Sequence, residues 1–266
     1  MDNHAIGIFD SGVGGLTVVK SVFSELPNER IIYFGDTERL PYGSKSKAVV
    51  TKFAKEITHF LLKKEVKAII IACNTASANA LEELQREFEI PIFGVIDAGV
   101  NVALDSTKNK KIGVIGTAGT VKSSAYEQKL HEKDKTCQVI QKACPLFVPL
   151  AEEGWLTDSV TYEVAKKYLS PLVAEGVDTL ILGCTHYPLL KKCIGEVVGE
   201  NVILVDPAKE TARTVKQFLV ENDMESAECG SREHEFYLSD QTEMFSELCK
   251  KALKREFAVE IVEELE

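Results

Sequence analysis

The sequence of 266 residues lacks the features that mark several large classes of protein. Its seven cysteines are scattered and include no CxxC pair, which argues against a zinc ribbon and against a disulfide framework. It has no HExxH motif and no acidic cluster at ligand spacing, so no metal is expected. There is no basic segment before an apolar one at the N-terminus, and no uncharged apolar run is long enough to span a bilayer. We therefore expect a cytoplasmic protein with reduced cysteines and no membrane partner.

Positive charge is also scarce. Lys and Arg number 31 against 41 Asp and Glu, which gives a formal net charge of −10. Basic residues do not cluster with aromatic ones as they do on a nucleic-acid-binding face. We therefore expect no nucleic-acid partner.

What the chain does contain is a regular alternation of two kinds of segment. Short β-branched runs, each the length of a buried strand, alternate with stretches whose apolar residues recur at helical spacing. The predicted strands are 6–9, 31–34, 68–72, 92–95, 112–115, 139–140, 179–182, 202–205 and 235–238, and the clearest predicted helices are 45–64, 76–88, 158–174 and 208–222. This alternation predicts an α/β fold, in which ligands bind beyond the carboxyl ends of parallel strands.

The chain also resembles itself when it is displaced by a little over 100 residues. VKAIIIACNT (66–75) aligns with VDTLILGCTH (177–186), and two further pairs of segments align in the same order at nearly the same offset, IGIFDSGVGG with IGVIGTAGTV and VIDAG with LVDPA. The repeat predicts two pseudo-symmetric halves, each a mostly parallel sheet flanked by helices, with the active site in the cleft between them. The expected domains are residues 1–97 plus 207–266, and residues 98–206.

Cys73 and Cys184 occupy the same position in the repeat. Each follows a predicted buried strand and precedes polar residues at the start of a predicted helix. A thiol at the N-terminus of a helix ionises more readily than a free thiol, so it can act as acid and base near neutral pH. Either cysteine alone is more simply explained as a small core residue, but the paired position favours a functional role. Two thiols facing each other across a ligand suit removal of a proton from one face of a carbon and its return to the other.

The first predicted strand leads into a glycine-rich loop at residues 10–15. Glycines allow the backbone to approach a ligand closely, and the helix that follows offers free N–H donors to an anion. The loop lacks GxGxxG spacing and a Walker lysine, so a tight turn is an equally good explanation. Asp10 disfavours a phosphate and favours a zwitterion such as an amino acid.

Other polar residues lie at the expected strand ends. Asn74, Thr75 and Thr185 flank the two cysteines, although helix capping explains them equally well. Tyr42 and Gly43 lie in a Pro-Tyr-Gly turn, and His186 follows Cys184 closely enough to assist proton movement.

In order along the chain, the motifs DSGVGG, YFGDTERLPYG, ACNTASA, GVIDAG, PLAEEGW and LGCTHYPLL resemble those of the glutamate racemases, in the aspartate/glutamate racemase family. The resemblance implies a cofactor-independent interconversion of L- and D-glutamate that supplies D-glutamate for peptidoglycan, carried out by a homodimer. It implies that Cys73 and Cys184 are the acid/base pair, assisted by Asp10 and His186. It places substrate contacts at Asp10, Ser11, Tyr42, Gly43, Asn74, Thr75, Thr185 and His186, and further polar positions of the site at Asp36, Thr117, Thr120 and Glu152, with Glu153 adjoining the last.

Three alternatives stay open from the sequence. The chain could racemise aspartate or another amino acid. It could be an amino-acid-binding sensor in which both cysteines are core residues. It could also be a redox switch that uses Cys73 and Cys184 as a disulfide pair.

Overall fold

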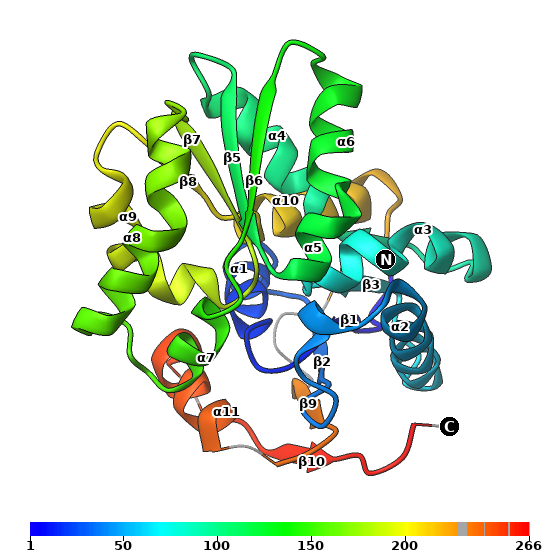
Figure 1. Ribbon diagram of the computed structural model, residues 1–266. Helices are drawn as coiled ribbons and strands as arrows, with labels where there is room; N and C mark the ends of the chain where they lie inside the picture. The colour runs from blue at the N-terminus through cyan, green and yellow to red at the C-terminus, as the bar shows by residue number, and fades with distance from the viewer. Residues whose placement is uncertain (228–232, 242, 255, 266) are drawn as a thin grey trace. The chain divides into compact units, whose positions relative to one another are not determined.

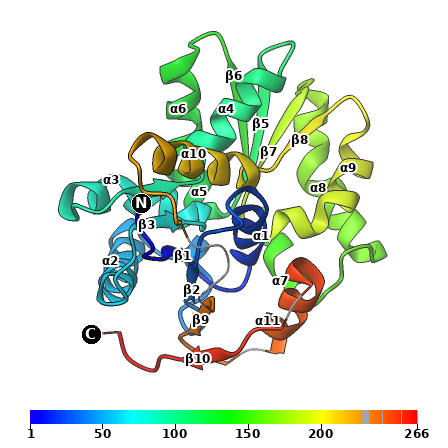
Figure 2. The same cartoon turned by 180° about the vertical axis from the view of Figure 1, so that it is seen from behind.

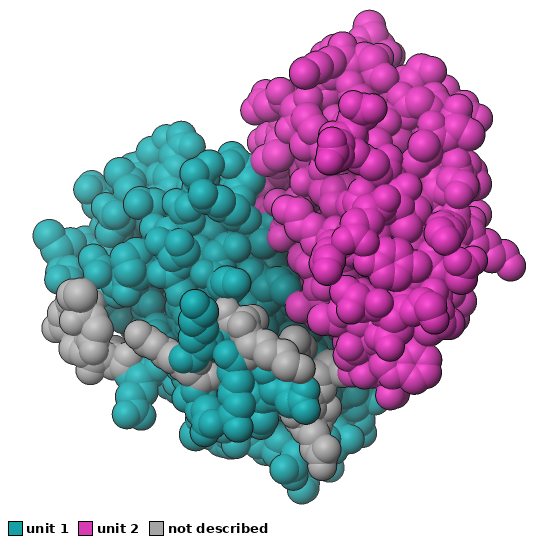
Figure 3. Space-filling view, turned by 90° about the vertical axis from the view of Figure 1, so that its left-hand side faces the viewer, with its two compact units in different colours: residues 1–95, 208–266 teal, residues 96–207 magenta. Residues whose placement is uncertain are grey.

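The structure is a computed structural model that describes residues 1–227, 233–241, 243–254 and 256–265. The chain forms two compact units, each with its own sheet and core (Figure 3). Unit 1 comprises Met1–Val95 and Ala208–Glu266, and unit 2 comprises Ile96–Pro207. Cys229 lies outside the described residues, and the other six cysteines are buried free thiols.

Unit 1 contains a six-stranded parallel sheet in the order β10-β9-β2-β1-β3-β4 (Figure 1). Its central strands are fully buried and consist largely of Ile, Phe and Ala, as expected for a sheet that is covered on both faces. The strands are β1 (Ile6–Asp10), β2 (Ile31–Gly35), β3 (Ala68–Ile71), β4 (Ile92–Gly94), β9 (Glu235–Leu238) and β10 (Val259–Ile261).

The helices of unit 1 cover its sheet in pairs. Helix α2 (Lys47–Lys63) starts at Ser46, whose side chain accepts a hydrogen bond from the Val49 N–H, and buries an apolar stripe at three-to-four spacing. It packs with α3 (Asn74–Glu87), while α1 (Leu16–Glu25) packs with α10 (Ala208–Glu221) (Figure 2). Shorter elements are η1 (Tyr42–Ser44), α11 (Glu243–Leu248) and the π-helical turn η3 (Cys249–Leu253).

Unit 2 contains a four-stranded parallel sheet in the order β6-β5-β7-β8. Its strands are β5 (Lys111–Gly116), β6 (Gln138–Ala143), β7 (Thr179–Gly183) and β8 (Ile203–Val205). Helices α8 (Ser159–Ala174) and α9 (Lys191–Val198) share a buried core with β5 and β7, and α4 (Ile96–Ser106) packs with α6 (Ala125–Lys133). The remaining helices are α5 (Ala118–Ser123), α7 (Phe147–Glu152) and the 3₁₀ turn η2 (Tyr187–Leu190).

The two sheets share one topology. Numbered within each unit, the first four strands occur in the order second, first, third, fourth, and β9 and β10 extend the sheet of unit 1 beyond β2. The prediction of an α/β fold with repeated, parallel, helix-flanked sheets is therefore confirmed. Strands β3 and β7, which precede Cys73 and Cys184, are equivalent in this repeat.

None of the helices in the described ranges is long and apolar enough to cross a membrane.

Candidate functional site

In unit 1, the predicted site residues collect at one edge of the sheet. They follow β1, β2 and β3, which are neighbours in the sheet and end at the same level, since Asp10 pairs with Gly35 and Phe9 pairs with Ile71. The topology therefore brings together Asp10, Ser11, Asp36, Tyr42, Gly43, Cys73, Asn74 and Thr75, as expected for the carboxyl ends of parallel strands.

Asp10 organises the glycine-rich loop from within. Its side chain is fully buried, and Oδ2 accepts hydrogen bonds from the N–H groups of Gly12 at 3.2 Å and Gly15 at 3.0 Å. A Cβ added at Gly15 would lie only 2.5 Å from the Cβ of Asp10, so the loop needs glycine there. Asp10 therefore helps to shape the loop, which adds to the ammonium-binding role expected from the sequence.

Strand β2 also supports the glycine-rich loop. The hydroxyl of Tyr33 donates a 2.6 Å hydrogen bond to the carbonyl of Gly12, and Tyr33 is fully buried. Burial, together with the nearby Asp10, raises the pKa of Tyr33 well above its ordinary value, so the hydroxyl remains a donor. A Cβ at Gly35 would lie 2.6 Å from the Gly12 carbonyl oxygen, which explains why β2 ends in glycine.

Cys73 is the N-cap residue of α3. Its thiol donates to Ser11 Oγ at 3.5 Å, and the residue is 5% exposed. Asn74 and Thr75 form the first turn of α3 and are both buried. Cys73 thus has the position at a helix N-terminus that the sequence predicts, where the backbone N–H groups favour a thiolate.

Asp36 and Tyr42 form a buried network at the end of β2. Tyr42 donates its hydroxyl to Asp36 Oδ2, and Arg39 donates Nε to both oxygens of the same carboxylate at 2.9 and 2.7 Å. Burial and the neighbouring carboxylate of Asp36 raise the pKa of Tyr42 far above its ordinary value. The polar groups of this network therefore bind one another and hold the turn that carries Tyr42 and Gly43.

The predicted residues of unit 2 also gather at one edge of their sheet. Thr117 and Thr120 follow β5, Glu152 ends α7 after β6, and Cys184 and its neighbours follow β7. Thr117 caps α5 by accepting a hydrogen bond from the Thr120 N–H at 3.2 Å, and the two hydroxyl groups lie 3.1 Å apart. At least part of the role of Thr117 is thus to cap this helix.

Cys184 does not lie at the start of a regular helix, and that part of the sequence prediction is wrong. Residues 184–186 form a bend and a turn, η2 follows as a 3₁₀ segment, and α9 begins only at Lys191. Pro188 gives the reason, because a helix starting at Thr185 would place the proline ring against the carbonyl of Cys184. The bend instead brings His186 alongside the thiol.

His186 links Cys184 to Glu152. Its Nδ1 lies 3.9 Å from Cys184 Sγ, and its Nε2 lies 3.1 Å from Glu152 Oε1. Cys184 and His186 are buried, and the side chain of Glu152 is 24% exposed. A carboxylate, an imidazole and a thiol in this order can stabilise a thiolate and move a proton to or from it.

A comparison with known protein families matches residues 7–215 to the Asp/Glu/hydantoin racemases. The chain belongs to this family. A glutamate racemase from Geobacter metallireducens is 52% identical over 236 residues, 89% of this chain and 87% of that protein. Among solved structures, glutamate racemases from Bacillus anthracis and from Francisella tularensis, the latter in complex with D-glutamate, align with TM-scores of 0.94 and 0.92 at 39% and 43% identity, each over 98% of both chains.

The electrostatics of His186 fit acid/base chemistry in a member of the racemase family. Burial alone would lower the pKa of His186, but its contacts with Cys184 and Glu152 outweigh burial and raise the pKa to about 10. The imidazole is therefore a cation at neutral pH. Both ring nitrogens of the cation carry hydrogens, so Nδ1 can act as a donor toward Cys184 Sγ.

Replacing Glu152 by glutamine should shift the pH dependence of activity. The change removes one of the contacts that raise the pKa of His186, so the pKa falls and the cation is lost at lower pH. We expect the alkaline limb of kcat/KM against pH to move to lower pH by about one unit. The matched control is Glu153→Gln, because Glu153 is the exposed neighbour. An equal shift in both variants, or none in Glu152→Gln, would refute this role of Glu152.

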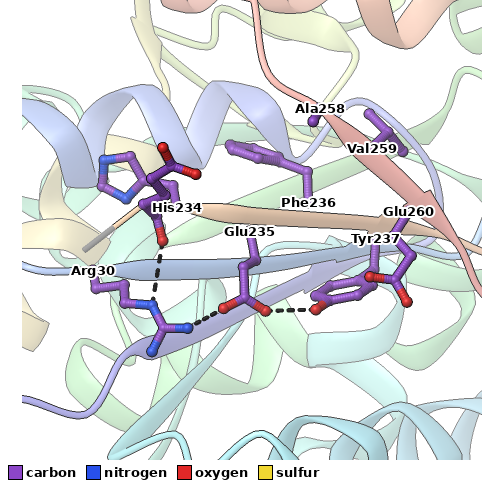
Figure 4. Close-up of a pocket in the computed structure, with 9 residues that line it drawn as sticks. Arg30, His234, Glu235, Phe236, Tyr237, Ala258, Val259 and Glu260 are labelled. Atoms are coloured by element: carbon purple, nitrogen blue, oxygen red, sulfur yellow. Dashed lines mark hydrogen bonds and ion pairs between the residues drawn. The ribbon is translucent and has the colours of Figure 1, made fainter.

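Unit 1 of this racemase-family chain also carries a surface hollow of about 580 Å³ at the opposite edge of its sheet (Figure 4). Arg30 precedes β2, and Glu235 and Val259 begin β9 and β10, so the hollow lies at the amino ends of the strands. Glu235 accepts from Arg30 and from the hydroxyl of Tyr237, as Figure 4 shows. These groups bind one another, and this hollow is not the candidate site.

Within the described part of the chain, no group of three His, Cys, Asp or Glu side chains is arranged to hold a metal ion.

The sequence does not single out Ser239 as a site residue. In the structure, its hydroxyl donates a hydrogen bond to Asp36, which lies more than 200 residues earlier in the sequence. A usable signal was present, because Ser239 directly follows the predicted strand 235–238, just as the selected polar residues follow theirs.

Proposed function

We propose that this chain interconverts L- and D-glutamate by a two-base mechanism that needs no cofactor, with Cys73 and Cys184 as the two acid/base groups. The observation that best supports the proposal is the equivalent position of the two thiols. Each follows the third strand of its own sheet, in two sheets that share one strand order. The relatives named above are glutamate racemases.

In the proposed reaction, one cysteine is a thiolate and the other is a thiol. The thiolate takes the proton from the α-carbon, and the thiol donates a proton to the opposite face of the resulting carbanion. Inversion leaves the first cysteine protonated and the second as the thiolate, which is the starting state for the reverse reaction. The mechanism therefore requires the two groups to act on opposite faces of the substrate.

The polar residues around each thiol are proposed to bind and orient glutamate. In unit 1 these are Asp10, Ser11, Tyr42, Gly43, Asn74 and Thr75, with Asp10 also assisting Cys73. In unit 2, Thr185 and His186 have these roles, with Thr117 and Thr120 as further polar contacts. Backbone N–H groups and neutral hydroxyl and amide side chains can hold carboxylates alongside the His186 cation.

The same proposal includes a cellular role. The product D-glutamate would serve peptidoglycan synthesis in the cytoplasm, and the enzyme would act as a homodimer. The support for these points is the resemblance of the sequence motifs to the glutamate racemases.

The proposal is tested by incubating the purified protein with L-glutamate in D₂O without added cofactor. We expect deuterium to enter the α-position of the product, since each inversion delivers a deuteron from a solvent-exchanged thiol. We also expect optical rotation to decay to zero, because the two enantiomers reach equal concentrations. The measurements are ¹H NMR of the α-proton and polarimetry, with L-aspartate run in parallel.

Each alternative predicts a different outcome. Faster racemisation of aspartate than of glutamate would identify an aspartate racemase. Binding of glutamate with no exchange by folded protein would indicate a sensor. Loss of two free thiols under mild oxidant in the absence of substrate, reversed by reductant, would favour the redox switch.

A further inference from the structure

The carboxylate of Asp36 is buried and receives donors from three side chains. Tyr42 donates to Oδ2, Arg39 donates to both oxygens, and the hydroxyl of Ser239 donates to Oδ1 at 3.0 Å. Asp36 itself has no exposed surface. A buried carboxylate is stable only when its oxygens are hydrogen-bonded, so these three donors determine where it lies.

Ser239 comes from a distant part of the chain. It follows β9, which adds to the edge of β2 and brings residues 239 and 240 beside residues 35–38. The N–H of Ser239 donates to the carbonyl of Gly35 at 3.1 Å, and its Oγ accepts from the Glu38 N–H at 2.9 Å. Ser239 is therefore held in place independently of Asp36.

A second contact docks the same segment without touching Asp36. The hydroxyl of Thr37 donates to the carbonyl of Asp240 at 2.6 Å, and the Asp240 N–H donates back to Thr37 Oγ1 at 2.9 Å. A substitution of Thr37 therefore weakens docking of the segment but removes no donor to Asp36. This separation allows a matched control.

Arg39 completes the support of the Tyr42 turn. It bridges Asp36 to Glu56 of α2, and its guanidinium lies over the ring of Phe53 at 4.1 Å. The ring of Tyr42 lies against the same Phe53, with 5.6 Å between ring centroids. Once packing has placed the ring, the hydroxyl of Tyr42 can reach Asp36 only while the carboxylate keeps its orientation.

We propose that Ser239 is a positioning residue for substrate binding: through Asp36 it fixes Tyr42, and so the turn that carries Gly43. The inference rests on the proposed function, in which Tyr42 and Gly43 contact glutamate. Asp36 then acts as a support and does not contact substrate, because both of its oxygens are bound by protein donors. The C-terminal segment becomes part of the machinery that binds substrate.

Loss of this support should affect binding more than chemistry. The turn would hold glutamate equally in the ground state and in the transition state, and loss of such uniform binding raises KM while leaving kcat nearly unchanged. We expect Ser239→Ala to raise KM about tenfold for both enantiomers, the size typical of a lost hydrogen bond to a charged group. Ser239→Thr keeps the hydroxyl and should restore KM.

The test measures kcat, KM and the melting temperature of Ser239→Ala, Ser239→Thr, Thr37→Val and Tyr42→Phe, and of the double variant Tyr42→Phe/Ser239→Ala. Thr37→Val should keep the KM of the wild type, although it weakens docking of the same segment. The double variant should raise KM by less than the product of the two single effects, because both changes break one network. If Ser239→Ala does not fold, Ser239→Cys replaces it, with the same expected rise in KM.

The outcomes separate this inference from the proposed function. A wild-type protein that does not racemise glutamate defeats the proposed function. An active wild type with unchanged KM in Ser239→Ala, or an equal rise in KM in Thr37→Val, defeats the positioning role. Independent effects of Tyr42→Phe and Ser239→Ala would also overturn it.

Discussion

Replacing either Cys73 or Cys184 by alanine is expected to lower kcat for racemisation in both directions by about 10²–10⁴-fold, the contribution typical of a positioned acid/base group. Inversion needs a proton acceptor on one face of the α-carbon and a proton donor on the other. Each cysteine serves as acceptor in one direction and as donor in the other, so the loss of either thiol slows both directions. Polarimetry with each enantiomer measures the effect.

The two variants should differ in the exchange that remains. The thiol left in each variant can still take the α-proton from one enantiomer and return a deuteron to the same face. We therefore expect slow exchange in D₂O with retention of configuration, for one enantiomer in Cys73→Ala and for the other in Cys184→Ala. NMR of the α-proton detects this exchange, and the same preference in both variants would contradict the assignment of one thiol to each face.

Cys137→Ala is the matched control for both variants. Cys137 is a buried free thiol ahead of β6, and burial raises its pKa above the ordinary value, so it remains a protonated thiol that has no free site for a further proton. We expect this variant to keep the activity of the wild type. Near-full activity in either Cys73→Ala or Cys184→Ala would show that the two-base assignment is wrong.

The sequence predicts the fold well because its strands are buried on both faces. Runs such as 68–72 contain almost only β-branched and small residues, a pattern that a buried parallel strand requires. Strand β6 is longer than predicted, because Gln138 is exposed and Gln141 and Lys142 are half-buried, positions where polar side chains are tolerated. Strand β10 escaped prediction for a related reason, since it is a three-residue edge strand that is mostly exposed.

The candidate site also contains residues that local sequence predicts and contacts that it does not predict. Residues that directly follow a strand, such as Cys73 and Cys184, can be found from local sequence because the topology of a parallel sheet determines where they lie. The bond between Ser239 and Asp36 joins residues that are far apart in the sequence. The strand before Ser239 marks it as a candidate site residue, but no local pattern identifies Asp36 as its partner. The bend at Cys184 could have been anticipated from Pro188, which prevents a helix from starting at Thr185.

Local sequence likewise does not predict the ion pair between Lys67 and Glu29, which are distant in the chain. Lys67 precedes β3, and its Nζ lies 2.6 Å from Glu29 Oε2 with both side chains almost fully buried. The ammonium also donates to the carbonyls of Asp2 and Met224, each at 2.7 Å, and Glu29 Oε1 accepts from the Ser226 N–H at 2.9 Å. The pair therefore ties the N-terminal residues and the segment after α10 to the start of β3.

Lys67→Met is expected to lower the free energy of unfolding by about 3–5 kcal/mol, the cost of leaving one member of a buried ion pair without its partner. The methionine fills a similar volume, so the loss arises mainly from the stranded carboxylate of Glu29 and from two carbonyls that lose their donor. Urea unfolding at constant pH measures the change. The control is Lys52→Met, whose side chain is 74% exposed beside Glu56, and its effect should stay within about 0.5 kcal/mol.

Adding Glu29→Gln to Lys67→Met should restore part of the lost stability, because it removes the unpaired buried charge. Recovery should be incomplete, since the carbonyls of Asp2 and Met224 still lack the ammonium donor. The expected signature is a double variant that is more stable than Lys67→Met alone, although Glu29→Gln by itself is destabilising. Additive losses in the double variant, or a loss below about 1 kcal/mol in Lys67→Met, would mean that the pair does not hold these segments together.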